Sequence, residues 1–132
     1  MPTMQTYCDQ GIQVNAGGAM QVLVPASVHN LVGPIPLSSN IISNLIMSDG
    51  MQVVAVGVTS TKAGAINVQR YLDDAGTIKQ GAVLTAALTA NTAQVLNITD
   101  GNPFASFTVQ LTNTDGSNAA TLSNVGILLQ GK

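Results

Sequence analysis

Two runs of alternating side chains, residues 51–59 and 65–72, constrain the fold of this chain most strongly. Apolar residues fall at every second position in each run, which is the period of a strand with one buried face. A short polar link joins the two runs, and Asp/Gly pairs flank them. Segment 49–76 therefore predicts a β-hairpin at the centre of the domain. The side chains assigned to its buried faces are Val54, Val56, Val58, Ile66, Val68 and Leu72.

Charged residues are scarce along the whole chain. They make up 8% of the sequence, and the six acids are all Asp, with no Glu. Long exposed helices usually recruit Glu and Lys, so this composition argues against them. Hydrophobic residues make up 45% and aromatic residues only 3%, which favours an aliphatic core between sheets.

Further strands are predicted by apolar alternation between turn residues. With 132 residues the chain is most simply one domain. We expect residues 1–18 to form an N-terminal arm with a short strand, and residues 19–132 a single all-β domain. Its predicted fold is an antiparallel β-sandwich, with a jelly-roll arrangement as one form of it. The additional strand segments are residues 19–24, 38–48, 81–90, 91–99, 103–112 and 120–130, of which 38–48 is also compatible with a helix.

The Pro-rich loop of residues 25–40 is unusually apolar. An apolar loop needs a surface to lie against. It covers the edge of the domain's own core or contacts a neighbouring subunit, and the sequence leaves both readings open. The apolar residues concerned are Val28, Leu31, Val32, Ile35 and Leu37.

Arg70 and Tyr71 are two further candidates for an interface. Arg70 falls on the face assigned to the core, where a charge is costly unless it is paired. It either reaches solvent at the strand end, pairs with Asp73 or Asp74, or pairs with an acid on a partner. Tyr71 falls on the opposite face and would suit an interface anchor.

Candidate catalysts and metal ligands are few. Five of the six acids lie in Asp/Gly-type turns, where a carboxylate accepts hydrogen bonds from nearby backbone N–H groups. The pair Asp73-Asp74 could hold calcium, but no further ligands follow at metal-loop spacing. Cys8 and His29 are the only thiol and the only imidazole. With no nucleophile elbow or nucleotide motif present, we expect no enzyme activity, catalytic residue, cofactor or metal.

Several broad classes are disfavoured by the same composition. The four cations are scattered and the sequence pI is about 4.7, which disfavours nucleic-acid binding. No signal peptide or membrane-spanning run is evident, so a soluble protein made in the cytoplasm is expected. One cysteine cannot form an internal disulfide.

Residues 64–131 resemble small β-rich structural proteins of tailed bacteriophages that decorate, or cement, capsids. The likeness rests on the I-x-V-Q-R-Y-L-D-x-A-G run at 66–76, on Pro103-Phe104 at a strand start, and on the apolar closing strand at 125–129. It implies a β-sandwich that binds the outside of a shell of major capsid protein as a homotrimer. The protein would then be a virion component made in the host cytoplasm.

Three other functions are kept as alternatives. A tail or neck component of such a virion would form larger rings. A small coat protein would assemble into particles by itself. A carbohydrate-binding or adhesin module would stack sugars on Tyr7 or Tyr71, since Trp is absent.

Overall fold

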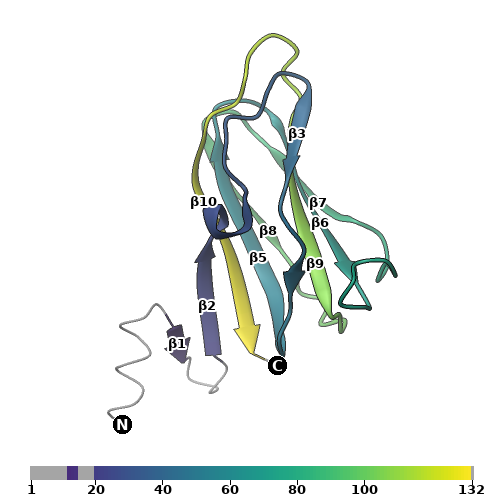
Figure 1. Ribbon diagram of the computed structural model, residues 1–132. Coiled ribbons are helices and arrows are strands. Elements are labelled where there is room, and N and C mark those ends of the chain that lie inside the picture. The colour runs from purple at the N-terminus through teal and green to yellow at the C-terminus, as the bar shows by residue number, and fades with distance from the viewer. Residues whose placement is uncertain (1–11, 15–19, 132) are drawn as a thin grey trace.

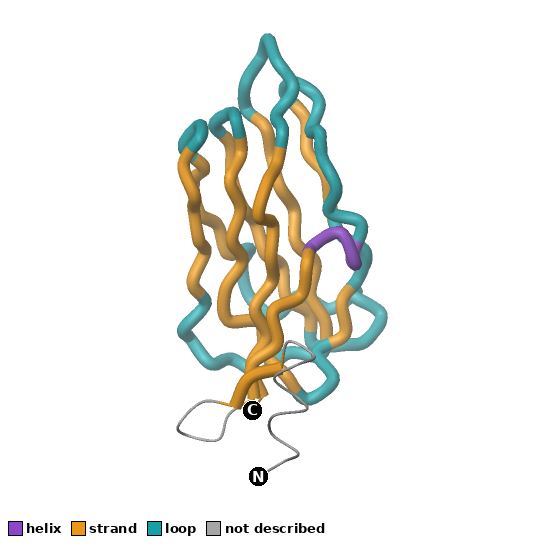
Figure 2. The backbone as a smooth tube through the Cα atoms, turned by 90° about the vertical axis from the view of Figure 1, so that its left-hand side faces the viewer, coloured by secondary structure: helices purple, strands orange, loops and turns teal. Residues whose placement is uncertain are grey.

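The protein is almost entirely β-structure in the computed structural model, which describes residues 12–14 and 20–131. Two antiparallel sheets pack face to face (Figure 1). The strands run roughly along the long axis of the molecule, and most loops gather at its two ends (Figure 2). In the described part of the chain, the 3-10 turn η1 (Ala26–His29) is the single helical element, and no helix is long and apolar enough to cross a membrane.

The strand order is that of a jelly roll. From β2 onward, β6 and β7 form the main hairpin within one sheet, whereas β5–β6, β7–β8, β8–β9 and β9–β10 cross between sheets. A chain that passes back and forth between two facing four-stranded sheets in this order forms a jelly roll. The prediction of an all-β antiparallel sandwich is therefore confirmed. The first sheet is β1 (Ile12–Val14), β2 (Met20–Pro25), β10 (Leu122–Gly131), β5 (Met51–Ser60) and β8 (Thr92–Asn97); the second is β3 (Ser39–Ile42), β9 (Ser106–Asn113), β6 (Gly64–Tyr71) and β7 (Leu84–Leu88), with β4 (Ile46–Met47) also on β9.

The predicted central hairpin is wrong, although both of its strands exist. β5 lies between β10 and β8, whereas β6 lies between β9 and β7 in the opposite sheet. The chain passes from one sheet to the other through the short link at residues 61–63, which lies outside the core. Alternation tells which face of a strand is buried, and that face can be covered equally well by a strand in the opposite sheet. The segment thus supplies one inner strand to each sheet.

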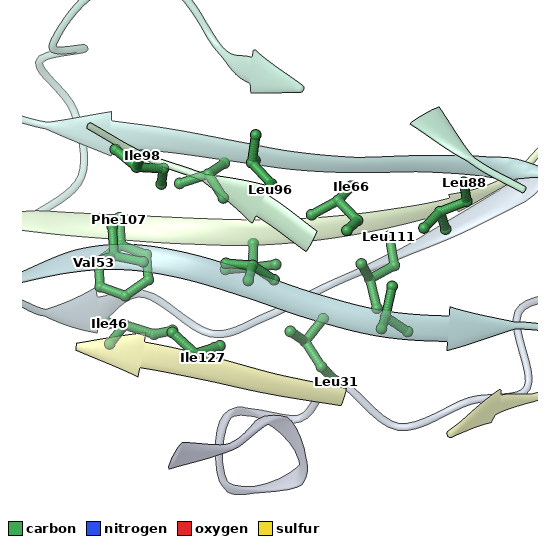
Figure 3. Packing of buried hydrophobic residues seen from close by; sticks show 14 of the residues in the cluster. Leu31, Ile46, Val53, Ile66, Leu88, Leu96, Ile98, Phe107, Leu111 and Ile127 are labelled. Atoms are coloured by element: carbon green, nitrogen blue, oxygen red, sulfur yellow. The ribbon is translucent and has the colours of Figure 1, made fainter. Parts of the chain in front are cut away.

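An aliphatic core fills the space between the sheets, with side chains of both sheets pointing toward one another (Figure 3). Phe104 and Phe107 add an edge-to-face contact with ring centroids 5.8 Å apart. Two assignments to this core were wrong. A register shift opposite Leu128 and Leu129 turns Val53 inward in place of Val54, and Leu72 follows the end of β6 and is exposed.

The remaining strand predictions are confirmed, with two refinements. Segment 38–48 forms β3 and β4, interrupted at residues 43–45. In β9 the predicted alternation holds except at Ser106, which is buried and whose hydroxyl donates to the Asp73 carbonyl. The predicted arm falls mostly on residues 1–11 and 15–19, outside the described residues, while β1 pairs with β2.

Candidate interaction face

The outward face of the first sheet is apolar at its centre. Strand register sets two rows of side chains across it. In one row Leu128 lies between Leu23 and Ala55; in the other, Gly126 and Gly57 lie between Pro25 and Val95. A sheet face directed to water is normally polar. We call these seven residues the apolar face.

Two glycines, Gly57 and Gly126, leave a depression in the apolar face. A Cβ at position 126 would lie 3.1 Å from Leu23 Cδ1, and one at position 57 would lie 3.6 Å from Val95 Cγ2. Because these positions carry no side chain, an open hollow of about 480 Å³ forms over them. Its walls include Leu23, which is 64% exposed, and Val95, which is 53% exposed. The shape suits an apolar projection from a partner.

Uncharged polar groups border the apolar face. Gln130 lies between Gln21 and Gln52 in the next cross-strand row, and Gln21 Nε2 donates to Gln130 Oε1 at 3.1 Å. Of the residues that the structure describes, none lining the hollow is charged. Binding here would depend on apolar burial and amide hydrogen bonds, with little salt dependence.

The Pro-rich loop divides between the core and the surface. Val28, Val32 and Leu37 are exposed, and Val32 borders a smaller hollow that shares Pro25 with the apolar face. Leu31 and Ile35 are buried in the core instead. Their predicted interface role is therefore corrected, because their side chains are covered by the chain itself.

Arg70 is also removed from the predicted interface. It faces the core, is 4% exposed, and pairs with Asp100 rather than with Asp73, Asp74 or solvent. Its Nη1 and Nη2 donate to Asp100 Oδ1 and Oδ2 at 2.8 and 2.5 Å. The guanidinium carbon also lies 5.9 Å from the centroid of the Phe104 ring. The sequence did not reveal Asp100 as the partner because 30 residues separate the two.

The turn role expected of the acids is confirmed where their hydrogen bonds are described. The Asp73 carboxylate accepts from Thr77 and the Ile78 N–H, and Asp115 accepts from the Ser117 and Asn118 N–H groups. These bonds lower the pKa of both carboxyls. The Arg70 guanidinium and the Asn102 N–H lower the pKa of Asp100 to about 2.

The low pKa of Asp100 predicts acid sensitivity. The folded-state pKa lies below the ordinary value of 3.8, so this stabilisation is complete above about pH 5 and is lost progressively as the pH falls through about 2. We expect a loss of roughly 1 kcal/mol across that window, allowing for solvent screening of the carboxylate. Urea unfolding at a series of pH values should show this loss in the parent and a smaller one in Asp100→Asn. If the free energy of unfolding falls with pH equally in the parent and in Asp100→Asn, the Asp100 carboxylate is not the source of the acid sensitivity.

Tyr71 lies on the outer face of the second sheet, where polar residues lie beside the exposed apolar side chains of Ile42 and Val83. It borders a hollow of about 210 Å³ together with Asn67, Gln69 and Lys79. The Gln69 Nε2 already donates to the Arg70 and Gly81 carbonyls. This placement leaves Tyr71 on the sheet face opposite to the apolar face.

Among residues 12–14 and 20–131, no three His, Cys, Asp or Glu side chains gather as metal ligands. His29 ends η1, and Cys8 lies outside the described residues. The apolar face itself was missed from the sequence. Its signal was the unbroken apolar run Val22-Leu23-Val24-Pro25, which is apolar on both faces of β2.

Comparison with known proteins adds no assignment. The sequence matches no protein-family model, and no curated protein resembles it significantly.

Proposed function

We propose that this chain is a virion structural protein that decorates a capsid, binding the outside of the major capsid protein shell through the apolar face. The observation that carries the proposal is the exposed hollow of about 480 Å³ at the centre of the first sheet. Burying such a surface gains about 25 cal/mol per Å² of apolar area before the cost of association. A homotrimer, as the resemblance implies, would present several such faces to the shell at once.

The contrast between the two sheets supports this orientation. The outward positions of the inner strands β6 and β9 carry Asn67, Gln69, Thr108 and Gln110, in contrast to the apolar positions of the first sheet. Ile42 of the edge strand β3 is the exposed apolar side chain beside them. Uncharged polar residues suit contact with water. The first sheet would therefore face the shell and the second sheet the solvent.

The jelly roll is compatible with this function without deciding it. Jelly rolls occur in viral capsid proteins and also in lectins and cupins, so fold alone does not define activity. The argument therefore rests on the apolar face.

Labelling of particles tests the proposal directly. An antibody against this chain should decorate the heads of intact particles made by the virus that encodes it, at a regular copy number on the shell. If the gold-labelled antibody is seen only on the tail in electron micrographs, the tail or neck alternative is supported. Particles formed by the purified chain alone would indicate a coat protein, and unlabelled particles would refute all three.

A matched pair of surface variants tests the apolar face. Leu23→Gln places an amide at the edge of the hollow, and we expect attachment to undecorated shells to weaken about tenfold or more. Ile42→Gln changes a similarly exposed apolar side chain on the second sheet and should leave attachment unchanged. Sedimentation of shells with each variant measures the difference. Equal binding by both variants would show that the shell is bound elsewhere.

A further inference from the structure

β8 is an uncovered edge of the first sheet. It pairs with β5 on one side, and no described strand pairs with it on the other. Strand β7, which precedes it, is likewise an edge of the second sheet. Both sheets therefore end at the β7–β8 connection.

Strand register identifies which backbone groups of β8 face outward. The Ile98 N–H donates to the Val54 carbonyl at 2.9 Å, which continues the β5–β8 register. Hydrogen-bonded positions alternate along an antiparallel pair. Even-numbered residues of β8 therefore bond to β5. The N–H and C=O groups of Ala93, Val95 and Asn97 point away from it.

This edge lacks the features that keep natural edge strands from pairing. Such strands usually carry Lys, Pro, inward charges or bulges. Residues 80–99, which include β7 and β8, contain no charged residue and no Pro. Val95, at the middle of the edge, is 53% exposed.

We infer that β8 pairs in an antiparallel manner with β8 of a second copy of this chain, about a two-fold axis at Val95. In this register Val95 meets its own counterpart, and Ala93 meets Asn97 of the second copy. All three outward-facing residues then pair with outward-facing residues, so each pair exchanges its N–H···O bonds. A two-fold contact of this kind is self-complementary. The uncharged edge brings no like charges together, although the chain as a whole carries a net charge of −2.

The two-fold axis would run perpendicular to the first sheet. The first sheets of both copies would join into one continuous sheet, and both apolar faces would lie on the same side. Val95 of each copy, which borders its own hollow, would pack against the other. This contact is separate from the proposed trimer, because a two-fold pair does not close a three-fold ring.

Mass measurement of the full chain tests the pairing. Val95→Lys places like charges opposite each other at the axis, which disfavours cross-strand pairs. We expect it to halve the mass of the parent in sedimentation equilibrium, with an unchanged circular dichroism spectrum. Leu23→Lys, a matched change on β2 away from the edge, should keep the parental mass. If the parent has the mass of two chains and the variant that of one, the pair is supported and the trimer is refuted. If the parent has the mass of six chains and the variant that of three, both the pair and the trimer are supported.

Cysteine substitution tests the register. In a Cys8→Ser background, Val95→Cys should form a disulfide-linked dimer, since a hydrogen-bonded pair has Cα atoms about 5.5 Å apart, within disulfide range. Ala93→Cys and Asn97→Cys should each stay uncrosslinked alone and form a dimer when mixed.

Two results would overturn the inference. One is a parent chain that sediments as a monomer up to its solubility limit while Val95→Cys fails to crosslink. The other is crosslinking of Asn97→Cys with itself as readily as Val95→Cys. Neither result would bear on attachment to shells, which Leu23→Gln measures separately.

Discussion

Gly64→Ala is expected to destabilise the protein by about 4 kcal/mol or more, or to prevent folding. Gly64 begins β6 and pairs with Asn113 of β9 on one side and Leu88 of β7 on the other. A Cβ at this position would lie 1.7 Å from the carbonyl oxygen of Thr112. Because that atom belongs to the backbone of a paired strand, no side-chain rotation relieves the clash. The β6–β9 pairing must open, which places the change in the exceptional class of large effects.

Gly57→Ala provides the matched control in the facing sheet. Its Cβ would make ordinary contact with Val95 Cγ2 at 3.6 Å, and we expect the free energy of unfolding to change by less than about 1 kcal/mol. Urea unfolding followed by circular dichroism measures both variants. Similar stability of the two variants would show that β6 and β9 are not packed as described.

The strands were predictable from sequence because their pattern is local. In β9, Phe107, Val109 and Leu111 alternate with polar residues, and the same residues are buried in the structure. The pairing of strands was not predictable in this way. β5 and β6 are adjacent in sequence and each buries one face, yet they lie in opposite sheets. Alternation carries no information about which strand supplies the covering layer.

The candidate interaction face was only partly predictable for a related reason. The apolar character of the 25–40 loop was evident from the sequence. Which of its residues are buried depends on tertiary contacts, which place Leu31 and Ile35 in the core and leave Val28 and Val32 exposed. The apolar face required the register of four strands, since Leu23, Leu128 and Val95 come from distant segments. Arg70 was correctly placed on the core-facing side, but its partner was not found.

Asp100→Ala is expected to lower the free energy of unfolding by about 3 kcal/mol. The change leaves the Arg70 guanidinium, which is 4% exposed, without the carboxylate that accepts its two hydrogen bonds. Removing one member of a buried ion pair costs about 3–5 kcal/mol. The lower end applies here because Asp100 is 37% exposed and water can replace part of its interaction. Asp74→Ala, in an exposed turn, is the control and should change stability by less than about 0.5 kcal/mol.

Arg70→Met separates the cost of an unpaired charge from the value of the ion pair. Met keeps an apolar contact with Phe104 and carries no charge to desolvate, so we expect a change within about 1 kcal/mol. In the Arg70→Met background, Asp100→Ala should cost less than about 1 kcal/mol, because no guanidinium is left unpaired. The difference between the two Asp100→Ala values is the coupling energy of the pair. If Asp100→Ala costs the same in both backgrounds, Asp100 acts through its turn and the Asn102 N–H rather than through Arg70.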